Sequence, residues 1–348
     1  NENFDVTVMM AGLQPNGSGI DLGLQAPDSS TVSFFGVSGT GRSVVFIVDS
    51  TKEMLIDEKG GMLAFDKVKN EIGALLTQLK RGTRFNIILF EGKQLAVFRA
   101  EPVPASPSNQ RLAMEWIAPL NRDYESLGMG NRFGETVPLT TEGELPIANQ
   151  DVSHYTRAIQ KAMEWRAGMI FCITKGYRRM SRSHSPEVLA KVAEARAKNP
   201  GTPGQVPPAA AKAWQEAVAE TRQWLQEENA ARREKGLPPK VVINFNGLVR
   251  EITGKNPPQR VGGTPGASVD LPRLEPITPD DLVDQLKELT KIHYQENSLD
   301  PPSVNLVLFL GEDEDIGEDR DHFRDLTRRN GGKLNLLRGL AALSDVTR

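Results

Sequence analysis

The sequence has few of the residues on which several classes of protein depend. Its 348 residues include one cysteine, Cys172, which excludes an internal disulfide and a cysteine-rich zinc site. No segment approaches the roughly 18 apolar residues that a membrane-spanning helix needs, so we expect no membrane insertion by this chain. The net charge of −3 gives no basic footprint for nucleic acid. What remains is a composition typical of a globular protein, with 39% hydrophobic and 25% charged residues.

Motifs for enzymatic chemistry are also scarce. The four histidines show no HxxxH or HExxH spacing, and although His154 lies near Asp151, no Gly-x-Ser-x-Gly nucleophile motif accompanies them. Residues 36–41 resemble a phosphate loop but precede a strand and lack Gly-Lys-Ser/Thr, so we expect a turn that leads into the first strand. The acidic run 311–321 lacks EF-hand spacing and is expected to precede a helix. These observations predict a protein that is not an enzyme.

Buried strands and amphipathic helices alternate along much of the chain. Short apolar runs rich in β-branched residues are typical of strands buried on both faces of a parallel sheet, and they occur at 44–50, 85–90, 169–174 and 304–310. A more alternating run at 94–100 predicts an antiparallel edge strand, and 333–338 a last strand. Helices are expected at 62–79, 110–120, 154–166 and 320–329. This order predicts an α/β fold, a three-layer αβα sandwich with a doubly wound, mostly parallel sheet.

The remaining segments predict a leader and an insertion. Residues 1–33 are rich in Gly, Ser, Pro and Asn and predict an extended leader. Residues 34–348 predict one domain with a helical insertion at about 181–300. Inside it we expect helices at 185–197, 209–235 and 278–297 and an extra strand at 241–245. On the helix at 209–235, the charged residues Glu216, Glu220, Arg222, Glu227, Arg232 and Arg233 predict a solvated face.

The segment SVVFIVDSTKEM, residues 43–54, carries the main functional signal. Asp49 ends its buried strand, where open α/β sheets place their ligand sites. Together with four other features, this segment makes the chain resemble von Willebrand factor type A domains. The four features are the strand FNIILF after Arg81-Gly82-Thr83, the helix with Trp116, the strand ending Thr174-Lys175-Gly176 and the GGKLNLL ending. The resemblance covers about residues 34–180 and 300–345 and implies the same α/β fold.

In that family a divalent cation is held by an Asp-x-Ser-x-Ser loop, a threonine from a second loop and an aspartate after a later strand. Hydroxyl and carboxylate oxygens suit a hard cation such as Mg²⁺. The matching positions here are Asp49, Thr51, Glu53, Ser153 and Lys175. An ammonium at Lys175 would repel Mg²⁺ and could pair with Asp49 or Glu53. The resemblance therefore implies a degenerate site without metal or other cofactor; the alternative is an intact Mg²⁺ or Mn²⁺ site.

These features predict a non-enzymatic, metal-independent module that binds or scaffolds another protein at the carboxyl edge of its sheet. The loop 121–150 and the insertion could extend this surface. The alternatives are a Mg²⁺- or Mn²⁺-dependent adhesion module and, less favoured, a hydrolase. The Gly/Ser-rich leader and the Phe-Phe-Gly turn resemble type A proteins of bacterial cell envelopes, which implies an extracytoplasmic location. Because the chain opens at Asn1, we expect a processed or truncated product without its signal peptide or anchor.

Overall fold

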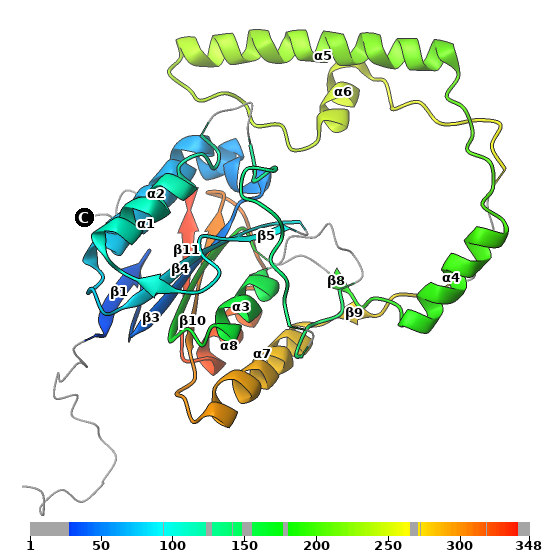
Figure 1. The fold of residues 1–348 in the computed structure, drawn as a ribbon. Coiled ribbons are helices and arrows are strands. Elements are labelled where there is room, and N and C mark those ends of the chain that lie inside the picture. Colours follow the sequence, from blue (N-terminus) through cyan, green and yellow to red (C-terminus); the bar gives the residue numbers. More distant parts are fainter. Residues whose placement is uncertain are drawn as a thin grey trace, which may run out of the picture.

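A seven-stranded, mostly parallel sheet forms the centre of the fold (Figure 1). The computed structural model describes residues 28–92, 94–122, 127–140, 142–147, 155–176, 180–264, 271, 273–317 and 319–339. The strand order is β11 (Leu334–Arg338), β10 (Ser303–Leu310), β7 (Met169–Thr174), β3 (Ser43–Asp49), β4 (Arg84–Glu91) and β5 (Gln94–Val97), with the short β6 (Val103–Pro104) beside β4. Only β5 and β6 run antiparallel to their neighbour. The predicted α/β fold with a mostly parallel sheet is confirmed.

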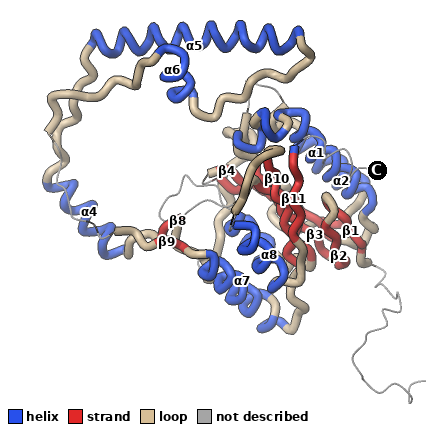
Figure 2. The backbone as a smooth tube through the Cα atoms, turned by 180° about the vertical axis from the view of Figure 1, so that it is seen from behind, coloured by secondary structure: helices blue, strands red, loops and turns tan. Residues whose placement is uncertain are grey.

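Helices cover both faces of this sheet, so two hydrophobic cores form. One face packs under α1 (Gly61–Gln78) and α2 (Pro107–Ile117), the other under α3 (Tyr155–Glu164), α7 (Pro279–His293) and α8 (Asp319–Arg329) (Figures 1 and 2). The central strands are apolar at successive positions because each face meets its own helix layer. No helix in the described part of the chain is long and apolar enough to cross a membrane.

A hairpin precedes the first central strand and corrects two predictions. Its strands are β1 (Ser30–Phe34) and β2 (Val37–Gly41), so residues 30–33 belong to the hairpin instead of the leader, and 37–41 form a strand instead of a turn. The turn lies at Phe35 and Gly36, both with positive φ. The Asn335 side chain donates a 2.6 Å hydrogen bond to the Phe35 carbonyl, which ties the hairpin to β11. The small, polar residues of β2 conceal it in the sequence.

The strands β8 (Met180–Ser181) and β9 (Pro276–Ile277) pair as a separate two-stranded sheet, and the chain between them forms an arch, residues 182–275. The described part of the arch contains α4 (Pro186–Lys198), α5 (Pro208–Glu234) and α6 (Phe245–Thr253), with α5 lying across the top of Figure 1, away from the sheet. The predicted strand at 241–245 is wrong. Its apolar residues have no neighbouring strand among the described residues, and the Asn244 side chain instead caps α6 by accepting a 2.9 Å hydrogen bond from the Gly247 N–H.

The helix α7 belongs to the layers of the sheet, although the sequence places it in the insertion. It packs on α3, and its buried face joins the second core through Leu282, Val283, Leu286 and Leu289. Thr278 caps it within a capping box with Asp281. The arch that stands outside the layers therefore closes at β9, before α7 begins.

The turn between α8 and β11 gives a test of the fold. A Cβ added at Gly332 would lie 1.9 Å from the Val304 carbonyl oxygen, a backbone atom that cannot move aside. We expect Gly332→Ala to lower the free energy of unfolding by about 1–3 kcal/mol, measured by urea denaturation. The control is Gly168→Ala, whose new Cβ would meet its nearest atom at an ordinary 3.5 Å. Equal unfolding midpoints for the two variants would contradict this packing.

Candidate functional site

The parallel strands β3, β4, β7 and β10 end at one edge of the sheet, called here the carboxyl edge. After β3 the chain forms two short 3₁₀ turns, η2 (Lys52–Leu55) and η3 (Asp57–Lys59), before α1 begins. Because β3 and β7 are neighbours, the residues that follow them meet. Of the predicted site, the structure brings together Asp49, Thr51, Glu53 and Lys175. Ser153 lies outside the described residues.

Asp49 is the centre of this edge. Its side chain is buried, and one carboxylate oxygen accepts hydrogen bonds from the Thr51 N–H at 3.0 Å and the Thr51 hydroxyl at 2.6 Å. The other oxygen accepts from the Thr174 hydroxyl at 2.9 Å and the Lys175 N–H at 3.4 Å. Four donors from the ends of two strands thus converge on one carboxylate and fix the loops that follow them. Thr174 was missed as a site residue, although it stands next to Lys175 at the strand end.

Lys175 pairs with Glu53 instead of Asp49. Its Nζ lies 3.0 Å from the Glu53 carboxylate, and the two side chains are only 12% and 25% exposed. Of the two partners that the sequence left open, the ammonium therefore takes Glu53, while Asp49 receives only the Lys175 backbone N–H. The pair closes the gap between the η2 turn and the end of β7.

A second buried ammonium lies at the same edge and was not predicted. Lys59 is 2% exposed, and its Nζ donates to the Phe309 carbonyl at 2.6 Å and pairs with Glu314 at 3.0 Å. Burial lowers the pKa of Lys59, and the Glu314 carboxylate opposes that shift. The acidic run after β10 therefore does more than precede a helix, because one of its carboxylates neutralises a lysine from another loop.

The end of β4 contributes a further carboxylate. Glu91 accepts a 2.6 Å hydrogen bond from the Met129 N–H, and burial raises the pKa of Glu91. Gly128 has a positive φ of 75°, and a Cβ there would come within 2.5 Å of the Glu91 carboxylate. The described part of the loop 121–150 is thus held against the carboxyl edge at this point, beside the residues of the predicted site.

In the described part of this edge, the groups that could bind a divalent cation are already engaged by the protein. A hard dication needs oxygen ligands with available lone pairs and no cation among them. Here both Asp49 oxygens accept protein hydrogen bonds, and the Lys175 ammonium pairs with Glu53 beside them. These contacts hold the loops after β3 and β7 in place.

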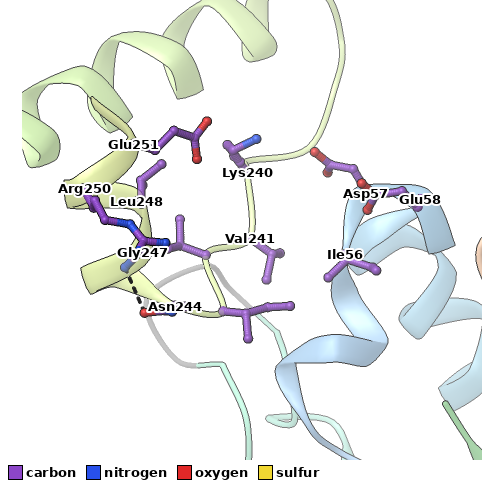
Figure 3. A pocket seen from close by; sticks show the side chains of 12 residues that line it. Ile56, Asp57, Glu58, Lys240, Val241, Asn244, Gly247, Leu248, Arg250 and Glu251 are labelled. Atoms are coloured by element: carbon purple, nitrogen blue, oxygen red, sulfur yellow. Dashed lines mark hydrogen bonds between the residues drawn. The ribbon is translucent and has the colours of Figure 1, made fainter. Parts of the chain in front are cut away.

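Two cavities flank the η3 turn. One, of about 620 Å³, lies between the turn and the arch, where Ile56 and Val241 face one another and Lys240 and Glu251 line the opposite side (Figure 3). The other, of about 550 Å³, lies between the turn and residues 311–314 and is lined by Asp57, Glu58, Glu312, Asp313 and Glu314.

The described part of the arch reaches the sheet domain at the η3 turn and at the first core. Arg232 of α5 donates a 2.7 Å hydrogen bond to Asp57, and Val241 packs against the first core. The prediction that Arg232 belongs to a solvated face is therefore wrong: its side chain is 14% exposed.

Cys172 is buried in the second core, and burial raises the pKa of its thiol, as expected for an inert cysteine.

We expect Asp49→Asn to lower the free energy of unfolding by about 1–3 kcal/mol, because the new amide group faces donors that the carboxylate accepts from. Whichever oxygen the amide nitrogen replaces, a backbone N–H, that of Thr51 or that of Lys175, loses its acceptor. The matched control is Asp313→Asn, at an exposed carboxylate of the same edge. Urea denaturation of both variants measures the difference. If Asp49→Asn were as stable as the control, the carboxylate would not hold the two strand ends together.

Comparison with known proteins gives little that bears on identity. No protein-family model matches the chain, and no curated protein matches its sequence. Among solved structures, a von Willebrand factor type A from Catenulispora acidiphila is similar, with 14% sequence identity and a TM-score of 0.22. The match covers 49% of this chain and 44% of that one, so the chain spans less than half of the structure it matches. A likeness of this size assigns neither a family nor a function to the chain. The α/β fold is established by the strand order and the helices of the structure.

Proposed function

We propose that this chain is a non-enzymatic protein-binding module of the von Willebrand factor type A kind, which works without a metal ion. Its contact surface is the carboxyl edge of the sheet around Asp49, Thr51, Glu53 and Lys175, extended by the arch. The observation that carries the proposal is the ion pair between Lys175 and Glu53 beside the fully hydrogen-bonded Asp49. Ser153 is part of the proposed edge through the resemblance alone.

Electrostatics supports metal independence. Two unit charges about 4 Å apart interact with about 4 kcal/mol at an effective dielectric constant near 20, and a dication doubles this repulsion from an ammonium. At the Lys175 position such repulsion opposes Mg²⁺, while the attraction to Glu53 holds the loop in place of the metal. The edge would then be ready to bind a partner whether or not a divalent cation is present.

The arch supports a protein as the partner. Of eight large apolar side chains that are exposed in the described part of the chain, six lie on the arch: Leu189, Leu237, Ile243, Val261, Leu271 and Leu274, at 37–56% exposure. Exposed apolar side chains gathered on a projecting element favour contact with another protein. The partner's identity and the extracytoplasmic, cell-envelope location stay part of the proposal, the latter through the resemblance of the leader and the Phe-Phe-Gly turn.

Calorimetric titration with Mg²⁺ and Mn²⁺ tests metal independence. We expect no binding heat from the native chain and saturable binding by Lys175→Asp, because the substitution removes the ammonium and restores a carboxylate. Lys175→Met removes the charge without adding a ligand, and Lys52→Asp makes the same change of net charge on a neighbouring loop residue.

Metal binding by the native chain would overturn the proposal and make the protein a metal-dependent adhesion module. Binding by neither the native chain nor Lys175→Asp would show that the lysine is not what keeps a metal out. Equal binding by Lys52→Asp and Lys175→Asp would mean that net charge, and not the site, attracts the cation.

Photo-crosslinking tests the contact surface. A benzophenone side chain at Glu58, which lines both cavities, should give covalent protein adducts in an extract of the producing cells, with equal yield in excess EDTA. The control position is Gln78, the exposed last residue of α1 at the opposite end of the sheet. Adducts that vanish in EDTA, or equal yields from both positions, would contradict a metal-independent partner at the carboxyl edge.

A further inference from the structure

The outer edge of β11 presents main-chain groups that pair with no described strand. The Leu306 N–H donates to the Lys333 carbonyl at 3.0 Å, which places the Lys333 carbonyl on the side of β10. Because main-chain groups alternate in direction along a strand, Asn335 and Leu337 also face β10. The N–H and C=O groups of Leu334 and Leu336 then point outward. β11 is the last strand of the sheet on this side.

A cavity of about 560 Å³ lies along this outer edge, between β11 and α8. Four of the residues that line it are cations: Arg320, Arg324 and Arg328 of α8 and Lys333 before β11. All four are exposed, and the described residues that line the cavity include no carboxylate. A positively charged groove thus runs beside an edge strand, although the chain as a whole carries a net charge of −3.

The spacing of the arginines matches that of an extended peptide. Arg320, Arg324 and Arg328 are four residues apart on one face of α8, a rise of about 6 Å between successive side chains. Side chains on one face of a β-strand recur every two residues, about 6.6 Å apart. As the crossover helix between the parallel strands β10 and β11, α8 runs roughly antiparallel to them. A strand beside β11 would therefore present every second side chain to this row.

We propose that the outer edge of β11 binds an extended acidic segment of a partner protein as an additional strand of the sheet. The segment's main chain would pair with Leu334 and Leu336, and carboxylates at alternate positions would meet the arginine row. Main-chain pairing supplies affinity in this mode of recognition, and the side-chain row supplies specificity. The surface lies at a lateral edge of the sheet and is independent of the carboxyl edge proposed above.

The local ion pairs of α8 leave the row able to bind. Arg324 pairs with Asp321 at 3.0 Å and Arg328 with Asp325 at 3.1 Å, but both pairs are largely exposed and join neighbouring turns of one helix. Exposed pairs of this kind are weak, so an incoming carboxylate can compete for the guanidinium. Positive charge also deters pairing between two copies of the same edge, which leaves the strand available to an acidic partner.

A designed peptide tests the proposal on the full chain. The probe is a fluorescein-labelled nonapeptide in which Asp or Glu alternates with Val or Thr, and binding is followed by fluorescence anisotropy at low salt. We expect saturable binding that weakens at least tenfold in Arg324→Glu and at least tenfold when the peptide's carboxylates are replaced by amides. The matched control is Arg111→Glu. Arg111 is an exposed arginine that pairs with Glu115 of the same helix, α2, which covers the other face of the sheet. This variant should bind like the native chain.

Backbone methylation separates strand pairing from charge attraction. One peptide is N-methylated at its acidic positions and a second at its apolar positions, so that each loses the donors of one side of the strand. We expect one of the two to bind like the parent and the other to lose binding at least tenfold. Circular dichroism of the protein variants checks that their fold is unchanged.

Several results would overturn the proposal. These are the absence of saturable binding, equal effects of Arg324→Glu and Arg111→Glu, or equal binding by the parent and both methylated peptides. Displacement of the peptide by a single-stranded RNA of the same length, with tighter binding that also depends on Arg324, would assign the groove to a polyanion instead of a strand. Peptide binding unchanged in Lys175→Asp would keep this surface distinct from the carboxyl edge.

Discussion

The arrangement of the carboxyl edge depends on one buried carboxylate. Asp49 ends β3, and its two oxygens collect donors from Thr51 and Thr174 and from the backbone of Lys175. A buried carboxylate without such donors would be costly, so the loops after β3 and β7 are constrained to lie where they can supply them. That constraint places Glu53 within reach of Lys175. The loop after β3 continues through Lys59 into α1, so the position of α1 follows from the position of this loop.

Charge balance explains how this edge tolerates so many ionised groups. The ammonium of Lys175 pairs with the carboxylate of Glu53, and that of Lys59 pairs with Glu314. Each pair joins segments that are distant in the chain, and an unpartnered member of either would carry a large desolvation cost. Asp49 and Glu91 are held by hydrogen-bond donors instead of a cation, while Glu58 and Asp313 are exposed.

Burial on both faces of a sheet explains what could be predicted from the sequence. The strands β3, β4, β7 and β10 appear as continuous apolar runs because every position meets a helix layer. The resemblance to type A domains grouped Asp49, Thr51, Glu53 and Lys175, and in the structure they meet because they follow the neighbouring parallel strands β3 and β7. The hairpin strand β2 could not be recognised, since its residues are small and polar and only packing against the rest of the fold makes it a strand.

Other features depended on contacts that no local pattern shows. The apolar residues at 241–243 indicate a strand, but Asn244 caps a helix and no strand in the described part of the chain lies alongside. Lys59 and Glu91 stand in ordinary polar sequence, and only the tertiary fold gives them Glu314 and Met129 as partners. Whether Lys175 would pair with Asp49 or Glu53 likewise depended on where the donors to Asp49 came from.

In topological terms the arch is the connection of a single β-hairpin, although it is far longer than a turn. Ser181 and Pro276 face one another as antiparallel neighbours, and residues 182–275, a stretch of 94, join them where two residues would be enough. The entropy lost on closing a flexible loop grows only with the logarithm of its length, by about 0.6 kcal/mol for each doubling. The sheet therefore tolerates this appendage at small thermodynamic expense.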